Sequence, residues 1–196
     1  MTEVERLATE VAKTTSNVDI LLANAGATWG EAFETHPESA FSKVLDLNVK
    51  SVFYTIQQFQ TLLRRRATVD DPSRVIVTAS IAGMAIGTLG PHATYSYSAS
   101  KAAVIHLTKN LAVELGPRHI LCNAVAPGFY PSKMSNGLIE LQGGEQKLAD
   151  ETPNRKVGRP EDFAALVVFL ASRAASHING DVITSDGGAV LRQGRL

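Results

Sequence analysis

The stretch Tyr97-Ser-Ala-Ser-Lys101 opens a long helical pattern and places a phenol and an ammonium group one helical turn apart. Residues i and i+4 share one face of a helix, so this spacing predicts that the Lys101 ammonium lies close to the Tyr97 oxygen. A cation about 4 Å away, in an effective dielectric of about 20, would lower a tyrosine pKa from about 10 to about 7. Tyr97 is then a candidate general acid or base. The alternative is a Tyr and a Lys that share a solvated helix face.

Apolar runs and helical patterns alternate on both sides of this helix. Strands are expected at four apolar runs, residues 18–23, 74–79, 119–125 and 181–184. Helices are expected around the apolar stripe of residues 4–11, from Pro37 to about Arg66, from Tyr97 to Gly116-Pro117, and from Pro160 onward. This alternation predicts an α/β fold with a parallel sheet, right-handed crossovers and helices on both faces.

Composition indicates a soluble protein with no affinity for nucleic acid or membranes. The 196 residues carry 19 Lys and Arg against 19 Asp and Glu, which gives no electrostatic attraction for either partner. The longest apolar run, Phe163 to Ala171, is too short to span a bilayer. A single cysteine, Cys122, excludes a disulfide scaffold and is expected to be buried. Glu3 and Glu5 stand where a secretory signal has positive charge, so a cytoplasmic location is predicted.

Polar and glycine motifs follow the apolar runs along the chain. In order they are Asn24-Ala25-Gly26, Asn48, Ser80, Tyr97-x-x-x-Lys101, Asn123-Ala-Val-Ala-Pro127-Gly128, Gly158-Arg-Pro-Glu-Asp162 and Asp186-Gly187-Gly188. Any one of them is weak evidence. Together and in this order they strongly resemble the short-chain dehydrogenase/reductase family, and the resemblance covers essentially the whole chain.

One family element has no counterpart in this sequence. Members of the family begin with a strand, a turn of the type Thr-Gly-x-x-x-Gly-x-Gly that holds the pyrophosphate, a helix and two further strands. Here Asn24 comes almost at once, and no other glycine cluster replaces that turn. The resemblance therefore implies a Rossmann-like, doubly wound parallel sheet lacking its first three strands, with residues 1–196 as a single partial dinucleotide-binding and catalytic domain. Strand 18–23 would then form an exposed apolar edge.

The resemblance implies an oxidoreductase that transfers a hydride between NADP or NAD, with NADP slightly favoured, and a small carbonyl or secondary alcohol. Tyr97 would protonate the developing alkoxide, and Ser80 would donate a hydrogen bond to the same oxygen. Lys101 would lower the Tyr97 pKa and hold the nicotinamide ribose. Asn48 would hold a water that links Lys101 to solvent; the alternative for Asn48 is an amide that caps a helix kink.

The residues that the resemblance assigns to the cofactor lie at strand ends and on the Tyr97 helix. They are Asn24, Ala25, Gly26, Tyr97, Lys101, Pro127, Gly128, Tyr130 and Ser132. Ser132 stands where the family commonly has Thr, and it keeps the hydroxyl. No metal is expected, because the histidines show no metal-ligand spacing.

The loop between Ser80 and Tyr97 is longer than is usual in the family, with the excess in residues 87–94. A long loop costs little extra closure entropy, so both ends are expected to keep their places. Tyr95 is a competing candidate for the acid, but it has Ala99 at i+4 and no lysine. Tyr97 is therefore preferred.

The segment from Phe129 to about Glu151 is expected to form a substrate lid. It mixes apolar and polar residues, which suggests a partly apolar carbonyl substrate. Its turn Pro131-Ser-Lys-Met134 resembles that of 3-oxoacyl reductases.

Two classes of function remain open. The first is a working oxidoreductase, forming a homodimer or homotetramer through the Asn48 and Tyr97 helices as family members do. The second is a catalytically impaired, truncated member of the family that acts as a non-catalytic oligomerising protein. Small residues on the Tyr97 helix would permit the close helix contact that both classes need, namely Ala99, Ala102, Ala103 and Ala112.

Overall fold

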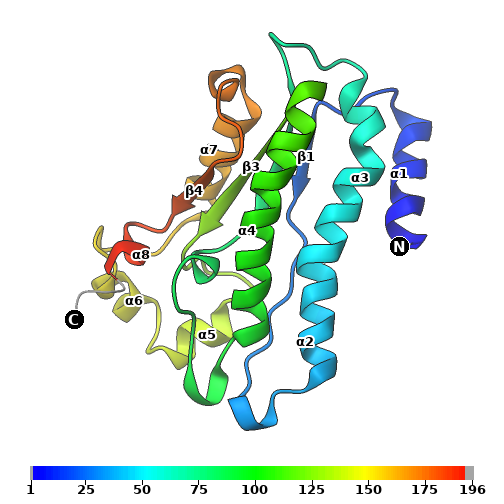
Figure 1. Ribbon diagram of the computed structural model, residues 1–196. Coiled ribbons are helices and arrows are strands. Elements are labelled where there is room, and N and C mark those ends of the chain that lie inside the picture. The colour runs from blue at the N-terminus through cyan, green and yellow to red at the C-terminus, as the bar shows by residue number, and fades with distance from the viewer. Residues whose placement is uncertain (1, 193–196) are drawn as a thin grey trace.

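Four parallel strands form the centre of the molecule in the computed structural model, which describes residues 2–192. In spatial order they are β1 (Ile20–Ala23), β2 (Ser73–Thr78), β3 (Ile120–Pro127) and β4 (Val182–Ser185). Every neighbouring pair is parallel. Parallel neighbours need a crossover connection, and each crossover contains at least one helix (Figure 1). The predicted strands and the predicted α/β, Rossmann-like fold are confirmed.

Helices from the first two thirds of the chain lie on one side of the sheet. They are α1 (Thr2–Thr14), α2 (Glu38–Leu45), α3 (Ser51–Arg64) and α4 (Tyr95–Leu115), of which α3 and α4 pack on the strands, while α1 packs on α3 and α2 packs on α4. Figure 1 shows α4 and α3 side by side against the sheet, with α1 beyond α3. Their apolar side chains pack on alternate strand residues, among them Val75, Val77, Cys122 and Ala124. The Cys122 thiol is buried as expected, and burial raises its pKa to about 12.

The opposite face carries a smaller core under α7 (Pro160–Ala171). Leu170 of α7 packs with Ile76 of β2 and Val125 of β3. Strand β1 lies at the edge of the sheet, and its outward residues Ile20 and Leu22 are 47% and 41% exposed. The expected exposed apolar edge at strand 18–23 is therefore confirmed.

The long helix predicted from Pro37 to about Arg66 is not uniform. A π-helical turn at Asp46–Lys50 joins α2 to α3. Such turns often occur at functional sites, and this one contains the buried Asn48. Apolar periodicity does not distinguish one π turn from an α turn, so the sequence pattern could not locate it.

Helix α4 begins at Tyr95 and ends at Leu115, next to Gly116-Pro117 as predicted, and a short 3₁₀ turn follows. Ala99, Ala102 and Ala103 lie on its exposed face, where a second helix could approach closely. Ala112 was expected on the same face, and this expectation is wrong. Its side chain is 2% exposed and packs in the main core.

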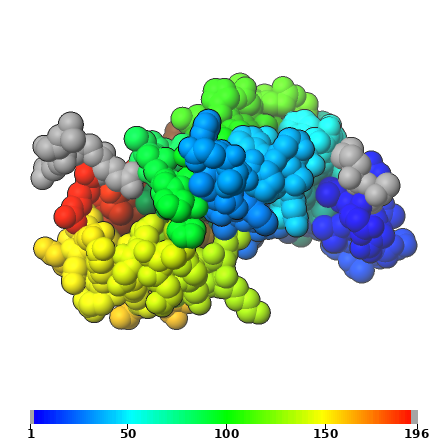
Figure 2. Space-filling model, turned by 90° about the horizontal axis from the view of Figure 1, so that it is seen from below, coloured from blue at the N-terminus to red at the C-terminus, as the bar shows by residue number. Residues whose placement is uncertain are grey.

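The segment expected to form the lid is a helical lobe between β3 and α7. It contains α5 (Asn136–Leu141) and α6 (Glu145–Glu151), and α8 (Ala189–Arg192) follows β4. Ile139, Leu148 and Val157 form a small core within the lobe. Seen from below in Figure 2, the yellow lobe lies against the green loop that follows β2. Within residues 2–192, no helix has both the length and the apolar character needed to cross a membrane.

Candidate active site

The carboxyl ends of β1, β2 and β3 meet at one edge of the sheet, which is where parallel α/β folds place their ligand sites. Asn24 follows β1, Ser80 lies just beyond β2, and Gly128 follows β3. Helix α4 brings Tyr97 to the same edge, where it shares one cavity with Ser80 and Gly128. Strand ends and one helix thus bring together residues that are distant in the sequence.

Lys101 is buried behind this cavity. Its side chain is 5% exposed, and its Nζ donates a 2.6 Å hydrogen bond to the carbonyl oxygen of Thr78 at the end of β2. Burial lowers the Lys101 pKa to about 8. The ammonium also lies next to Gly26, because a Cβ placed on Gly26 would be 3.8 Å from Nζ. Lys101 is therefore a desolvated cation between the ends of β1 and β2.

Tyr97 does not show the predicted electrostatic effect of Lys101. The Lys101 Nζ lies 5.5 Å from the centroid of the Tyr97 ring and is directed to Thr78. The Tyr97 pKa is raised above its usual value because burial disfavours the phenolate, while the neighbouring Ser80 hydroxyl acts in the opposite direction. The prediction that Lys101 lowers this pKa is thus wrong for this structure. The i,i+4 spacing placed the two side chains on one face, but it did not fix where the long lysine stem ends.

Ser80 is held by its own backbone turn. It lies in extended conformation and caps the 3₁₀ turn at Ile81–Gly83, where its Oγ accepts a 3.2 Å hydrogen bond from the Ala82 N–H. A serine hydroxyl that accepts one bond still has its proton to donate. Because Ser80 and Tyr97 both line the cavity, that proton is available to a substrate oxygen.

Asn48 is 1% exposed and joins two parts of the site. Its Oδ1 accepts a 2.8 Å hydrogen bond from the Ala27 N–H, and its Nδ2 donates to the Ala27 carbonyl at 2.9 Å and to the Ser100 Oγ at 2.9 Å. Both side-chain N–H groups are therefore used by protein partners. This geometry agrees with the alternative interpretation of Asn48 as an amide at a helix irregularity. Its role in holding a water stays a prediction.

Ser100 belongs to the site although it was not singled out from the sequence. Its fully buried hydroxyl donates to the Tyr97 carbonyl at 2.7 Å and accepts from Asn48. Ser100 thereby connects the loop after β1, through Asn48, to the first turns of α4. The signal in the sequence was its position at i+3 from Tyr97, on one face of the helix.

The cofactor residues predicted after β1 lie at the open edge of the site. Asn24 and Ala25 are exposed, and the Asn24 Oδ1 accepts a 2.8 Å hydrogen bond from the Thr78 hydroxyl. A Cβ on Gly26 would stand 3.2 Å from the Asn48 Oδ1, so a side chain here would crowd the amide. The absence of a side chain leaves the backbone of this turn open toward Lys101.

Pro127 and Gly128 lie at the end of β3. Pro127 is in register with Ser185 of β4, and the Gly128 N–H donates to the Ser185 carbonyl at 3.1 Å. A Cβ on Gly128 would come within 2.9 Å of Asp186, so only glycine allows this close approach. Gly128 also lines the cavity with Tyr97, in agreement with its predicted place.

Tyr130 and Ser132 lie beside the cavity and are not among its lining residues. The Tyr130 hydroxyl shares a 2.6 Å hydrogen bond with Ser185, and its ring covers Gly158. Ser132 is exposed on the lid, and its hydroxyl is 2.8 Å from that of Ser135. Neither side chain reaches Tyr97 in this structure. Their predicted contacts with the cofactor stay predictions.

The cavity between Tyr97 and the lid has a volume of about 230 Å³. Besides Ser80, Tyr97 and Gly128 it is lined by Thr28, Ile81, Ala82, Ile86, Gly87, Thr88, Thr94, Phe129, Met134, Ser135, Leu138 and Gln142. Sequence reasoning located the lid but did not single out Thr28, Thr88 or Gln142. They lie on three separate loops, and no local pattern relates them.

A parallel α/β sheet with a serine, a tyrosine and a buried lysine at its carboxyl edge defines a nicotinamide-dependent oxidoreductase of the Rossmann type. A family model described as enoyl-(acyl carrier protein) reductase matches residues 1–190. The chain belongs to the short-chain dehydrogenase/reductase family. It is therefore an NAD(P)-dependent short-chain dehydrogenase/reductase, as the sequence motifs predicted, and its cofactor is NADP or NAD.

Individual relatives agree with this assignment. The chain is 43% identical over 183 residues to the rhamnolipids biosynthesis 3-oxoacyl-(acyl-carrier-protein) reductase of Pseudomonas aeruginosa, covering 93% of this chain and 70% of the relative. The Pseudomonas aeruginosa RhlG/NADP active-site complex superposes with a TM-score of 0.87 at 41% identity, over 95% of this chain and 72% of that one. Ligand-free aldohexose dehydrogenase from Thermoplasma acidophilum gives a TM-score of 0.88 at 26% identity, covering 98% of this chain and 76% of that one.

The residues around Lys101 fit a nicotinamide cofactor. The ammonium has three N–H donors, of which the Thr78 carbonyl accepts one, so donors remain for hydroxyl groups of a ligand. The Gly26 backbone adjoins the same ammonium without a side chain in between. A cavity with a hydroxyl donor and a phenol opens on the other side. Lys101 and the turn at residues 24–26 are thus the groups that would hold the ribose portion.

Proposed function

We propose that this chain reduces a small carbonyl compound to the alcohol, with Tyr97 as the general acid and Ser80 as the hydrogen-bond donor to the carbonyl oxygen. The observation that carries the proposal is that the Ser80 hydroxyl and the Tyr97 phenol line one cavity at the carboxyl edge of the sheet. A substrate oxygen that reaches this cavity meets two hydroxyl donors. Such paired donors stabilise an alkoxide as it forms.

The direction of the Tyr97 pKa supports the acid role. Burial raises the pKa, so the phenol keeps its proton at neutral pH and can transfer it to an alkoxide. The hydride is supplied by the reduced nicotinamide when the cofactor is bound. Lys101, whose Nζ lies 5.5 Å from the centroid of the Tyr97 ring, would hold the ligand hydroxyls. Oxidation of an alcohol is the reverse reaction and requires the deprotonated phenol.

NADP is favoured over NAD as the cofactor, because the RhlG structure that this chain matches at 41% identity is an NADP complex. A 3-oxoacyl compound is a candidate substrate for a similar reason, since the relative at 43% identity is a 3-oxoacyl reductase. The apolar side chains Ile81, Phe129 and Leu138 in the cavity support a substrate with an alkyl portion.

The decisive experiment follows the fluorescence of NADPH and NADH as each is titrated with the purified chain, and then their oxidation with 3-oxoacyl thioesters. Saturable enhancement of the fluorescence, followed by oxidation that depends on the thioester, is the expected result. Enhancement without oxidation for any carbonyl compound would reject the catalytic proposal. No binding at millimolar cofactor would support the non-catalytic alternative.

The alternative is a non-catalytic oligomerising protein, which would associate through the same face of α4 that a working oxidoreductase would use. The exposed face of α4 carries Ala99, Ala102 and Ala103, and the large apolar Val113 on the same helix is 79% exposed. A second copy packed there would form a homodimer or homotetramer through α4 and the Asn48 segment. Light scattering of the purified chain tests it, and replacing Ala102 by Glu should dissociate such an oligomer.

A further inference from the structure

We propose that the substrate of this site is an uncharged carbonyl compound with an apolar chain, and that Gln142 and Thr88 limit the length of that chain. The inference rests on the proposed function, because it concerns the same cavity. It adds the charge of the substrate and the residues that determine specificity.

The cavity wall contains no formal charge. Among the described residues that line it, the polar groups are hydroxyls of serine and threonine, the Tyr97 phenol and the Gln142 amide. The remaining surface comes mainly from Ile81, Ile86, Phe129, Met134 and Leu138. A carboxylate or phosphate placed here would lose its hydration, and no cation in the cavity wall replaces that hydration. Neutral substrates are therefore selected.

Two walls of the cavity begin at strand ends and lead away from the reacting groups. The first wall follows the chain from Ser80, just beyond β2, to Thr88. The second follows the chain from Gly128, after β3, to Gln142 at the end of α5. Leu138 of α5 and Gln142, the residue that caps the end of α5, are four apart, and both line the cavity.

The last residues of the two walls meet. The Gln142 Nε2 donates to the Thr88 Oγ1 at 3.4 Å, which joins the lid to the loop after β2. The loop itself is fixed on α4, because a Cβ on Gly87 would come within 2.4 Å of the Ser98 Oγ. The Gln142 side chain thus closes the cavity against a loop that packs closely on α4. A hydrogen bond of this length is weak, so a smaller side chain at position 142 would open the closure.

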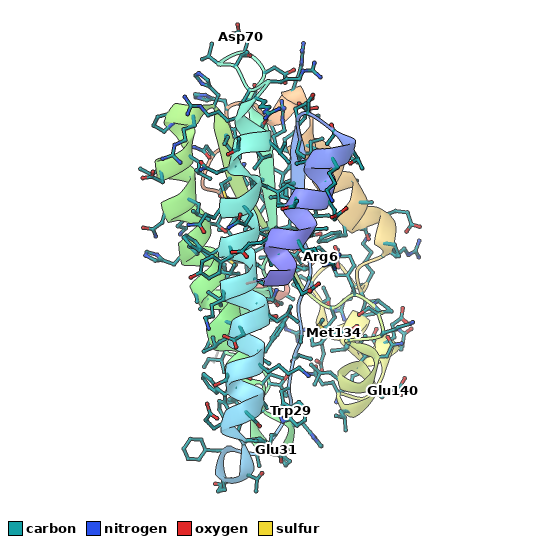
Figure 3. The ribbon with its side chains drawn as sticks, turned by 90° about the vertical axis from the view of Figure 1, so that its right-hand side faces the viewer. Arg6, Trp29, Glu31, Asp70, Met134 and Glu140 are labelled. Atoms are coloured by element: carbon teal, nitrogen blue, oxygen red, sulfur yellow. The ribbon has the colours of Figure 1, made fainter. Side chains whose placement is uncertain are left out.

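The single tryptophan of the chain provides a reporter that does not need turnover. Trp29 is 43% exposed and directly follows the cavity residue Thr28. Figure 3 shows Trp29 on the loop after β1 and Met134 on the lid, and Met134 also lines the cavity. A ligand between these segments is expected to change the emission of Trp29.

The test measures the binding of straight-chain 2-alkanols of increasing length through Trp29 emission, and NADPH-dependent reduction of the matching 2-alkanones. The wild-type chain should gain about fourfold in affinity for each methylene group until a limiting length, beyond which affinity falls. In Gln142→Ala the limit should move to longer chains. Gln146→Ala, an exposed glutamine on α6, is the matched control and should keep the wild-type limit.

An unchanged limit in Gln142→Ala would overturn the assigned role of Gln142. Hydroxy acids that bind as tightly as alkanols of the same length would overturn the selection against charge. If Gln142→Ala does not fold, Thr88→Val keeps the shape but removes the acceptor, and it must move the limit in the same direction. If binding depends on chain length but no ketone is reduced, the proposed function alone is rejected. If ketones are reduced but the limiting chain length is the same in the wild type and the variants, this inference alone is rejected.

Discussion

The Lys101 ammonium and the Thr78 carbonyl oxygen form a 2.6 Å hydrogen bond that ties helix α4 to the end of strand β2. Thr78 is the last residue of its strand, so its carbonyl lies at the edge of the sheet where the site is. Within residues 2–192, no carboxylate forms an ion pair with this buried ammonium. The ammonium lies 5.5 Å from the centroid of the Tyr97 ring.

Burial of Lys101 predicts a specific pH dependence of stability. Its pKa is about 8 in the folded chain against 10.5 for a free lysine, so between these values the unfolded chain binds more protons. The free energy of unfolding should therefore rise with pH across this window, by about 3 kcal/mol at most from Lys101 alone. Urea unfolding of the wild type and of Lys101→Met between pH 7.5 and about 10.5 measures this rise in the free energy of unfolding.

Subtracting the unfolding free energies of Lys101→Met from those of the wild type at each pH cancels the contributions of other groups, such as Cys122 with its raised pKa. Exposed Lys109→Met serves as the control and should keep the wild-type slope. Parallel curves for the wild type and Lys101→Met would contradict a desolvated ammonium.

Removing the Tyr97 hydroxyl should abolish most of the turnover and leave binding intact. Tyr97→Phe loses the proposed acid but keeps the ring, so the reduction rate should fall about 100- to 10,000-fold. Cofactor affinity, read from nicotinamide fluorescence, should stay nearly unchanged. Tyr95→Phe is the matched control, because Tyr95 packs against Phe33 and His36 and does not line the cavity. A Tyr97→Phe variant that retains most of its rate would refute the assignment.

The sequence predicted the fold well because its signals are local and repeated. Each strand is a short apolar run, and each predicted helix has a periodic stripe or a clear stop such as Gly116-Pro117, whereas the short helices α5, α6 and α8 were not predicted. The order of these elements then restricts the topology, because parallel crossovers follow one hand. The π turn at Asp46–Lys50 escaped this reasoning, since one additional residue in a turn hardly changes the apolar pattern.

The site was predictable in its residues and less so in its interactions. Ser80, Tyr97 and Lys101 are recognisable from spacing and from their positions after strands or on a helix. The path of the Lys101 side chain to Thr78 depends on a strand distant in sequence, and spacing on α4 carries no information about it. The same holds for Gln142 and Thr88, whose contact joins segments that are 54 residues apart.

The hydroxyl of Ser100 should contribute measurably to stability. Ser100→Ala would leave one N–H of the buried Asn48 amide without its partner, and an unsatisfied buried donor costs about 1–3 kcal/mol. Urea unfolding should show this loss. Ser42→Ala is the control, because Ser42 is exposed on α2 and bonds only to Glu38 among the described contacts of its side chain, so the change should stay within about 0.5 kcal/mol. Equal stability of the two variants would show that the network carries little free energy.

Two glycines with opposite surroundings test how tightly the turn after Ser80 packs on α4. A Cβ on Gly83 would stand 2.5 Å from the backbone of Lys101, whereas a Cβ on Gly137 in α5 would meet nothing within 4 Å. Gly83→Ala should therefore push the turn away from α4 and destabilise the chain by about 1–3 kcal/mol. Gly137→Ala should stabilise it by about 0.4–1 kcal/mol, because alanine reduces the freedom of the unfolded chain.

Because the turn at Ile81–Gly83 is capped by Ser80, displacing it also moves the Ser80 hydroxyl relative to Tyr97. Gly83→Ala should then lower the reduction rate even at temperatures where the chain stays folded, and Gly137→Ala should not. Thermal unfolding, together with turnover measured well below the midpoint, separates the two effects. A Gly83→Ala variant with wild-type stability and wild-type rate would mean that the contact with the Lys101 backbone does not position Ser80.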